Sequence, residues 1–465
     1  MSTKKYGRPA QGIDWILFLA YLGLVGIGLL MIYTTSFNDN MTTAQMWSPN
    51  SIFGRQLLWA GISILFLFVI SFIDWHFWNS ISLLLYILSI AALVIVLLFG
   101  NEINGAKSWI AIGPASFQPG EFAKLGVIAF CASLLSSIQI KLNEWKSQAL
   151  LLVLISIPAF LIILQPDPGS ALTFYSLLIV FFRFGMPAIY YAIGFATFLT
   201  IVSSLIFGFY AVALTIILLA FFSSLNFSKS NPTPILIFGT IVLTCVLLFQ
   251  FDFQIYGLAL SASSFITWLI LKGGLYSSRL LTLAGSIGLI AISFGSSFAF
   301  NNVLKPHQQD RINVWLQPEK CDPQGSLYNL LQSKLAIGSG GLSGKGYLNG
   351  PLTRLNYVPA QTTDFIFSSI GEEQGFIGGI AVILLFTILT LRLIKIGEAS
   401  KYLYIRAFCY GVAGLIFFHF FINIGMTMGA SPVIGIPLPF ISKGGTALLS
   451  FSIMIGIALN MSKEK

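Results

Sequence analysis

Long apolar stretches recur along this chain from end to end, and they restrict it to one class of fold. Each stretch runs for about 16 to 25 residues, enough for an α-helix to cross a hydrocarbon core about 30 Å thick. In all, 56% of the chain is hydrophobic and only 9% is charged, which excludes an ordinary soluble domain. We therefore predict an all-α, polytopic integral membrane protein with about fourteen transmembrane helices. The expected spans are residues 13–35, 56–73, 77–99, 121–139, 148–165, 169–184, 187–207, 209–224, 233–251, 255–271, 280–300, 366–391, 403–428 and 443–461.

The basic residues predict which side of the membrane each loop faces. Lys4, Lys5 and Arg8 precede the first span, so we expect the N-terminus in the cytoplasm. That span lacks a cleavage-site pattern and is expected to be retained rather than removed as a signal peptide. Alternation of the spans then puts the C-terminus in the cytoplasm as well and most basic residues on the same side. The basic residues expected in the short outer loops are Arg55, Lys107, Lys124 and Lys443.

Cysteine and histidine are too few and too scattered to suggest a disulfide framework or a zinc site. The chain has four cysteines and three histidines. They are Cys131, Cys245, Cys321 and Cys409, and His76, His307 and His419. We predict no metal-binding residues among them.

One segment differs from the membrane-like remainder. Residues 301–363 are polar, contain proline and glycine, and fall on the outer side by the count of spans. A long structured loop of this kind usually carries function. The alternative is a surface cap that only covers the helices.

Ionisable residues at membrane depth are functional candidates, because each costs roughly 2.5–3.5 kcal/mol to insert. Glu121 and Lys124 open the fourth span three residues apart, on one helical face where their charges can neutralise each other. The alternative reading is an interfacial ion pair that eases insertion. Asp167 lies between two prolines at a junction of helices, where a helix N-cap and a site residue are equally good interpretations.

A group of carboxylates stands at the head of the apolar run over 366–391. We expect Asp364 to begin the helix that carries Glu372 and Glu373. At about 1.5 Å per residue, Glu372 would lie roughly 12 Å deeper than Asp364. Asp364 can cap the helix and interact with its dipole, but capping does not explain the two glutamates. The stretch therefore predicts an acidic wall facing a cavity that opens outward.

Two further segments have unusual backbone chemistry. The glycine-rich run at 336–347 is not a phosphate loop, because a Walker motif needs Gly at position 339 and Ser or Thr at position 346, where this chain has Ser339 and Gly346. We expect its glycines to permit tight turns and Lys345 to meet an anion. Residues 429–445 contain several prolines and predict irregular backbone beside a cavity or buried in the helix bundle.

Five polar motifs follow one another along the chain in a fixed order. They are NGAKSWIAIGPASFQPGEFAK (104–124), QPDPGSAL (165–172), QPEKCDPQGSLYNLLQSKLAIGSGGLSGKGYLNG (317–350), TDFIFSSIGEEQGFIGG (363–379) and NIGMTMGASPVIGIPLPFISKGG (423–445). In this order they resemble the SEDS family (shape, elongation, division and sporulation), and more closely its rod-elongation members. The resemblance implies a glycosyltransferase of the bacterial cytoplasmic membrane that polymerises lipid II, the undecaprenyl-pyrophosphate disaccharide pentapeptide, into peptidoglycan. It also implies a class B penicillin-binding protein as the transpeptidase partner.

The resemblance also implies roles for individual residues. The family's catalytic aspartate falls on Asp364, its Glu and Lys after the Gln-Pro pair fall on Glu121 and Lys124, and its Trp falls on Trp109. The other residues expected to bind substrate or line the cavity are Lys107, Asp167, Arg311, Lys345, Glu372 and Glu373. The positions that depart from the family pattern are Ser108, Thr362 and Lys443, where members commonly have Arg, His and Tyr.

The number of spans also departs from the family. Its members usually have about ten, and the surplus of about four lies within residues 187–300. An even insertion keeps the 301–363 segment outside, as the catalytic loop of a single membrane domain over 1–465. We expect the additional helices to be peripheral packing.

Other functions remain open at this stage. A transporter or lipid flippase would use the glutamates as a proton relay, and a scaffold for wall synthesis would have no activity. We see no internal repeat of the kind that transporters have, and the polar groups gather at one face, which favours chemistry there. Within the family, a division-specific member is the alternative, and the run GLSGKGYLNG (341–350) favours elongation.

No cofactor is certain from the sequence. A divalent cation, Mg²⁺ or Mn²⁺, would neutralise the leaving pyrophosphate, although no dedicated set of ligands is visible. The net charge of +9 reports membrane topology, so we expect no nucleic-acid partner.

Overall fold

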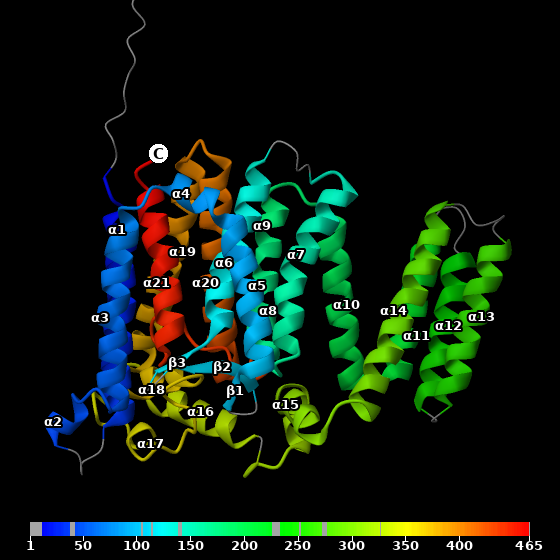
Figure 1. Ribbon diagram of the computed structural model, residues 1–465. Helices are drawn as coiled ribbons and strands as arrows, with labels where there is room; N and C mark the ends of the chain where they lie inside the picture. The colour runs from blue at the N-terminus through cyan, green and yellow to red at the C-terminus, as the bar shows by residue number, and fades with distance from the viewer. Residues whose placement is uncertain are drawn as a thin grey trace, which may run out of the picture. The chain divides into compact units, whose positions relative to one another are not determined.

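The computed structural model describes residues 12–37, 42–103, 106–112, 115–137, 142–225, 233–250, 253–271, 277–325 and 327–464. The chain divides into two compact units (Figure 1). The first comprises Met1–Pro187 and Asp322–Lys465, and the second comprises Ala188–Cys321. Lys4, Lys5 and Arg8, on which the prediction of a cytoplasmic N-terminus rests, lie outside the described residues.

The first unit is built from helices, with one small sheet. Its helices are α1 (Trp15–Ser36), α2 (Thr43–Met46), α3 (Ile52–Ser71), α4 (Trp75–Ser80), α5 (Ser82–Phe99), α6 (Pro119–Ser136), α7 (Trp145–Ile163), α8 (Pro168–Thr173), the 3₁₀ turn η1 (Phe174–Leu177), α9 (Leu178–Arg183), α16 (Tyr328–Ser339), α17 (Pro351–Arg354), α18 (Ile366–Glu373), α19 (Gly375–Ala399), α20 (Leu403–Met428) and α21 (Gly445–Met461).

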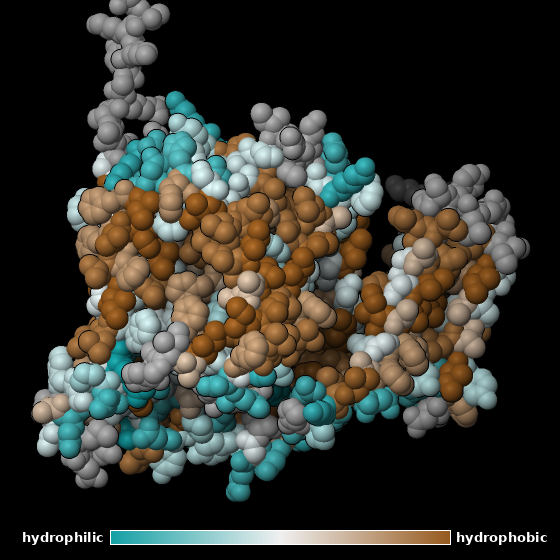
Figure 2. All heavy atoms as spheres, viewed as in Figure 1, coloured by the Kyte–Doolittle hydropathy of each residue, from teal (hydrophilic) through white to brown (hydrophobic). Residues whose placement is uncertain are grey.

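The prediction of a helical, multi-span membrane protein is confirmed. Among the described residues, nine helices are long and apolar enough to cross a membrane. The shorter apolar helices are Pro168–Arg183, Phe209–Ser224, Ile237–Gln250 and Gly445–Met461. Figure 2 shows an apolar band across the visible face of the first unit, with hydrophilic residues at both ends of the helices. The short helices α16 to α18 and the strands gather at the end opposite the C-terminus (Figure 1).

The span predicted over 366–391 is not one continuous helix. Asp364 precedes the helix, α18 ends at Glu373, and α19 starts afresh at Gly375. The break follows from Gly375, whose φ of 65° lies in the left-handed region that glycine adopts without strain. Glu372 therefore does not lie deeper along one continuous membrane helix that begins at Asp364.

A small sheet was not predicted. Strands β1 (Asn101–Ile103), β2 (Ala106–Ile112) and β3 (Ala115–Phe117) pair antiparallel in that order. β2 alternates along AKSWIAI, so Lys107 and Trp109 share one face and Ser108 points to the other. The backbone N–H of Lys107 donates to the carbonyl of Gln165 at 3.1 Å. This bond fixes the sheet to the turn before α8.

Helices α6 and α20 form the centre of the first unit. Of their membrane-spanning windows, 72% and 78% is buried, against 28% for α5. α20 packs against α6 and α19, and α21 packs against α3 and α6. Small residues allow close approach, because a Cβ on Gly411 of α20 would lie 2.8 Å from Ile128 of α6. Polar residues on α6 and α20 consequently face protein rather than lipid.

The second unit is a separate helical bundle. Its elements are α10 (Ala188–Phe207), α11 (Phe209–Ser224), α12 (Thr233–Gln250), α13 (Gln254–Leu271), α14 (Ser277–Asn302), α15 (Pro306–Leu316) and the 3₁₀ turn η2 (Pro318–Lys320). A core around Phe221, Phe265 and Leu269 joins α11 to α13, and the Ser204 hydroxyl of α10 donates to the Ser293 carbonyl of α14 at 3.0 Å. Residues 301–321, expected in the outer loop, belong to this unit.

Candidate active site

The segment between α20 and α21, residues 429–444, forms the base of the candidate site, and we call it the joining segment. Gly429 ends α20 with a φ of 77°, a left-handed helix cap. Gly435 and Phe440 turn the chain again with φ of 73° and 66°. The side chains of Ile436, Leu438 and Phe440 are at most 3% exposed. Irregular backbone is thus buried in the bundle here, as the prolines predicted.

The turn that contains Asp364 is tied to this segment through its backbone. Asn423 of α20 donates its Nδ2 to the Asp364 carbonyl at 2.9 Å and to the Ile436 carbonyl at 2.7 Å. The Ser442 hydroxyl donates to the Thr363 carbonyl at 2.6 Å. Because these bonds hold main-chain atoms, they position Asp364 without using its carboxylate.

The Asp364 side chain is partly exposed and faces the joining segment. A Cβ built on Gly435 would lie 3.4 Å from Asp364 Oδ2, so the absence of a side chain there keeps the approach to the carboxylate open. Thr362 and Lys443, two of the positions that depart from the family pattern, are joined by a backbone hydrogen bond of 2.8 Å. The two departures therefore occur together on one side of Asp364.

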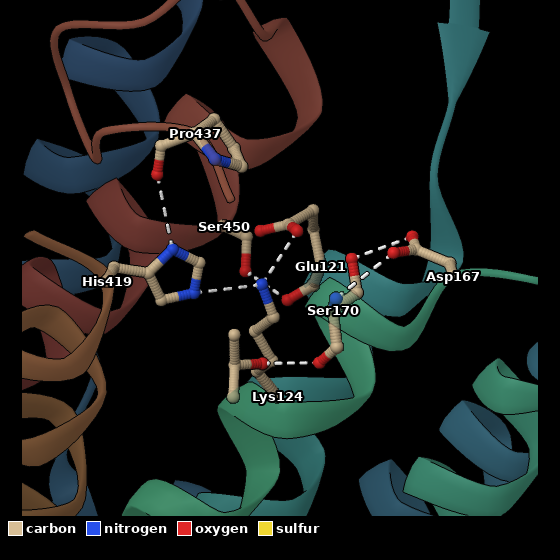
Figure 3. Close-up of polar contacts among 8 residues, drawn as sticks. Glu121, Lys124, Asp167, Ser170, His419, Pro437 and Ser450 are labelled. Carbon is tan, nitrogen blue, oxygen red and sulfur yellow. Dashed lines mark hydrogen bonds and ion pairs between the residues drawn. The ribbon is translucent and has the colours of Figure 1, made fainter. Parts of the chain in front are cut away.

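The predicted pair of Glu121 and Lys124 is buried and includes a third member. Lys124 Nζ lies 2.7 Å from Glu121 Oε1 and 3.2 Å from His419 Nε2 (Figure 3). The three residues are at most 2% exposed. The Ser450 hydroxyl of α21 donates to the Glu121 carbonyl at 2.7 Å. Both charges therefore face protein rather than solvent or lipid.

The geometry around His419 defines its tautomer. An ammonium group has only donors, so His419 Nε2 accepts from Lys124. The proton then belongs to Nδ1, which donates to the carbonyl of Pro437 in the joining segment at 3.3 Å. A neutral His419 thereby connects Lys124 to the same segment that holds Asp364.

Asp167 caps helix α8, as one of its two interpretations predicted. Its Oδ1 accepts from the backbone N–H of Ser170 at 3.0 Å, and its Oδ2 accepts from the Ser170 hydroxyl at 2.7 Å (Figure 3). The start of α8 also reaches the joining segment, because a Cβ on Gly169 would lie 2.3 Å from the Ile434 carbonyl. Only glycine permits this approach, and it brings the Asp167 cap beside the site.

Lys107 and Trp109 lie on strand β2 of the sheet. Both are partly buried, and they share a face of β2. Lys107 Nζ donates to the Leu98 carbonyl at 3.0 Å, so its side chain turns toward the end of α5. Ser108, in contrast, is 4% exposed.

Glu372 and Lys345 interact with each other, and the burial of Glu372 corrects its predicted role. Lys345 Nζ donates to Glu372 Oε1 at 3.0 Å, and Thr353 donates to Glu372 Oε2 through its N–H and its hydroxyl, both at 2.8 Å. Burial acts to raise the pKa of Glu372, but the hydrogen bonds from Thr353, Leu352 and Lys345 outweigh it and lower that pKa. Glu372 is fully buried and anchors the loop rather than lining an open cavity, and Lys345 uses one of its three donors in this pair.

Glu373 is buried like Glu372, but fewer hydrogen bonds stabilise its charged form. Burial, assisted by the charge of Glu372, raises the pKa of Glu373 to about 7, against hydrogen bonds from Leu348 and Thr34. The side chain of Glu373 is 1% exposed. The two glutamates therefore do not form the predicted acidic wall of a cavity, because both carboxylates are buried inside the packed loop.

The glycine-rich run encloses the junction of α18 and α19. The backbone N–H groups of Lys345 and Gly346 each donate at 3.0 Å, to the carbonyls of Glu372 and Glu373 respectively. A Cβ on Gly344, whose φ is 79°, would lie 2.1 Å from the Glu373 carbonyl. The run thus serves tight backbone packing, as expected, and the end of α18 is its partner.

Arg311 belongs to the other compact unit of the chain. It is exposed on α15 of the second unit, and the site residues belong to the first. Among the described residues, no three His, Cys, Asp or Glu side chains are grouped closely enough to hold a metal ion.

Sequence reasoning missed His419, Asn423 and Ser442 as parts of the site. The signal was available for the first two, because His and Asn are costly in an apolar helix such as α20 and usually face a site there. They lie four residues apart, on one face of the helix. Their partners could not be read from the sequence.

The fold and the site define a multi-span helical membrane protein whose polar residues converge at one end of the bundle. Residues 14–213 and 208–465 match the family described as cell cycle protein, the family of FtsW, RodA and SpoVE. The chain is 32% identical to the peptidoglycan glycosyltransferase RodA of Treponema pallidum over 98% of its length and 99% of that protein. It is 30% identical to the stage V sporulation protein E of Bacillus subtilis, covering 100% of this chain and 99% of that protein. The chain belongs to the FtsW, RodA and SpoVE family.

Solved structures show the same fold. The chain superposes on the rod shape determining protein RodA of Thermus thermophilus with a TM-score of 0.56 and 22% identity, covering 97% of this chain and 96% of that one. It also superposes, with a TM-score of 0.62 and 23% identity over 97% of both chains, on a chain from a peptidoglycan synthase complex that coordinates polymerization and crosslinking.

Proposed function

We propose that this protein is a peptidoglycan glycosyltransferase that polymerises lipid II. One observation carries the proposal: the Asp364 turn, the Lys124–His419 pair and the start of α8, which are distant in sequence, all contact the joining segment. The relatives named peptidoglycan glycosyltransferases, RodA of Treponema pallidum and MrdB of Escherichia coli, support this activity.

In the proposed reaction, Asp364 is the general base. The 4-hydroxyl oxygen of the acceptor sugar attacks the anomeric carbon of the donor, and the bond from that carbon to the pyrophosphate oxygen breaks. The hydroxyl proton passes to the Asp364 carboxylate, and undecaprenyl pyrophosphate leaves with the bonding electrons. A positioned base typically contributes about 10²- to 10⁴-fold, and the backbone bonds to Asn423 and Ser442 supply that positioning.

Lys124 is the proposed source of positive charge for the leaving pyrophosphate. Its Nζ interacts with Glu121 and His419, so one carboxylate already balances its charge before substrate arrives. His419 acts as a positioning residue, because it accepts from Lys124 and donates to the joining segment. Lys345 is paired with Glu372, and we assign it no part in the step.

The single carboxylate of Asp364 does not form a dedicated metal cage with other acids in the described part of the chain. A divalent cation that arrives with the substrate would neutralise pyrophosphate charge. The residues that we assign to the step are Asp364, Lys124 and His419.

We place this reaction at the outer face of the bacterial cytoplasmic membrane, with both termini in the cytoplasm. A class B penicillin-binding protein is the proposed partner, since glycan strands need crosslinking after polymerisation. We assign the protein to elongation and rod-shape maintenance rather than division. Depletion that gives round cells would support that assignment, whereas filaments would support a division role.

The Asp364→Asn variant tests the proposed base. The amide retains the shape of the side chain but cannot accept the proton, so we expect it to express and fold normally and to lose strand synthesis from purified lipid II. Asp364→Glu should also lose most activity, because the longer side chain misplaces the carboxylate. Polymerisation by Asp364→Asn within about tenfold of wild type would show that the base is elsewhere.

A further inference from the structure

A cavity of about 360 Å³ lies in the first unit between α9, α19 and α20. Its apolar lining includes Ile179, Phe182, Ile394, Ala413 and Phe417. The cavity reaches the last turn of α9, whereas the Asp167 cap lies at the first turn of α8. At about 1.5 Å per residue, these ends of the broken helix are roughly 20 Å apart. The cavity is therefore distinct from the candidate active site.

Polar groups occupy one end of this cavity. Arg183 donates its Nη2 to Glu398 Oε1 at 2.8 Å, and the Tyr410 hydroxyl also donates to Glu398. The Arg183 side chain remains 63% exposed. A guanidinium carries five N–H donors in a planar fork, so Arg183 retains donors for an incoming anion.

The charges at this end are unequal. Arg406 lies close by, where it donates to the Ser400 carbonyl at 3.2 Å, and Lys395 and Lys401 are exposed on the same turns. One carboxylate, Glu398, faces these cations. The excess of positive charge favours an anionic ligand.

We propose that this cavity binds an anionic phospholipid, with one acyl chain against the apolar lining and the phosphate at Arg183. A long apolar groove that ends in a basic polar cluster matches both halves of such a lipid, and basic pockets between membrane helices bind anionic head groups. Arg suits this role because its fork matches phosphate oxygens. The Glu398 and Tyr410 contacts hold the guanidinium at the cavity mouth.

Lipid binding to the full-length purified protein tests the proposal. Native mass spectrometry would compare phosphatidylglycerol with phosphatidylcholine of the same acyl chains. We expect wild type to prefer phosphatidylglycerol and Arg183→Gln to lose about fivefold of that preference, the effect of one basic residue near a membrane surface. Arg183→Lys should retain part of it. Ile179→Trp, at a position already 52% exposed, should narrow the cavity and weaken the binding of both lipids.

Lys395→Gln is the matched control, because Lys395 lies one turn from Glu398 on α19 and carries the same charge as Arg183, but it does not line the cavity. It should retain the preference within about twofold, and each variant's thermal unfolding midpoint should stay near that of wild type. Equal losses in Arg183→Gln and Lys395→Gln would overturn the proposal in favour of unspecific surface attraction. Absence of any preference in wild type, or stronger binding of undecaprenyl phosphate than of phosphatidylglycerol, would overturn it as well.

Discussion

Lys124 depends on two partners of different chemistry, Glu121 and His419. Removing one member of a buried ion pair leaves an uncompensated charge and costs about 3–5 kcal/mol in protein interiors. We therefore expect Glu121→Ala and Lys124→Ala each to lower the free energy of unfolding more than the double variant does. Each single variant should also lower lipid II polymerisation. Thermal unfolding in detergent and a polymerisation assay would measure both effects. Single variants with wild-type activity would exclude a role in the site.

Glu373 should make the stability of the loop depend on pH. Burial raises its folded pKa to about 7 from 4.5, so between these values the unfolded state loses its proton first and stability falls as pH rises. Glu373→Gln cannot ionise and should be more stable than wild type at pH 8, by at most about 3 kcal/mol for this shift. The difference should vanish near pH 4.5. A constant difference in the free energy of unfolding between the two proteins from pH 4.5 to pH 8 would contradict this prediction.

At the scale of elements, the glycine-rich run and the end of α18 form one packed unit. Gly344→Ala would strain a backbone with a φ of 79° and force a Cβ to 2.1 Å from the Glu373 carbonyl, so we expect a loss of several kcal/mol or failure to fold. Gly338→Ala is the matched control, since it lies inside α16 with open space around it and should gain up to about 1 kcal/mol. Thermal unfolding of the two variants gives the comparison. Equal behaviour would contradict the packing argument.

At the scale of the whole molecule, we expect lipid II polymerisation to depend on the first unit and not on the second. Ser263 and Ser286 of the second unit donate only to carbonyls of their own helices, those of Leu260 and Leu283. Alanine at either position should leave lipid II polymerisation within about twofold of wild type, because local hydroxyl bonds of this kind contribute little. Asp364→Asn serves as the inactive reference in the same assay. A marked loss from both serine variants would assign the second unit to catalysis.

The membrane spans could be predicted because hydrophobic length is a local property of the chain. Most predicted spans coincide with one helix, but 169–184 is divided among α8, η1 and α9. The span 366–391 is divided where Gly375 takes a backbone conformation that hydropathy does not report. The sheet at 101–117 was missed because its strands are short and gain their support from Gln165 in another segment.

The sequence by itself determined the class of protein, the positions of its spans and the polar residues that are costly enough in a membrane to need partners. Only the tertiary structure decided which partners those residues have. Lys124 meets His419 across 295 positions, and Ser442 holds the Asp364 turn across 79. It also paired Lys345 with the buried Glu372. Hydrogen bonds and ion pairs act over a few ångströms, and proximity on that scale between distant segments arises only when the helices pack.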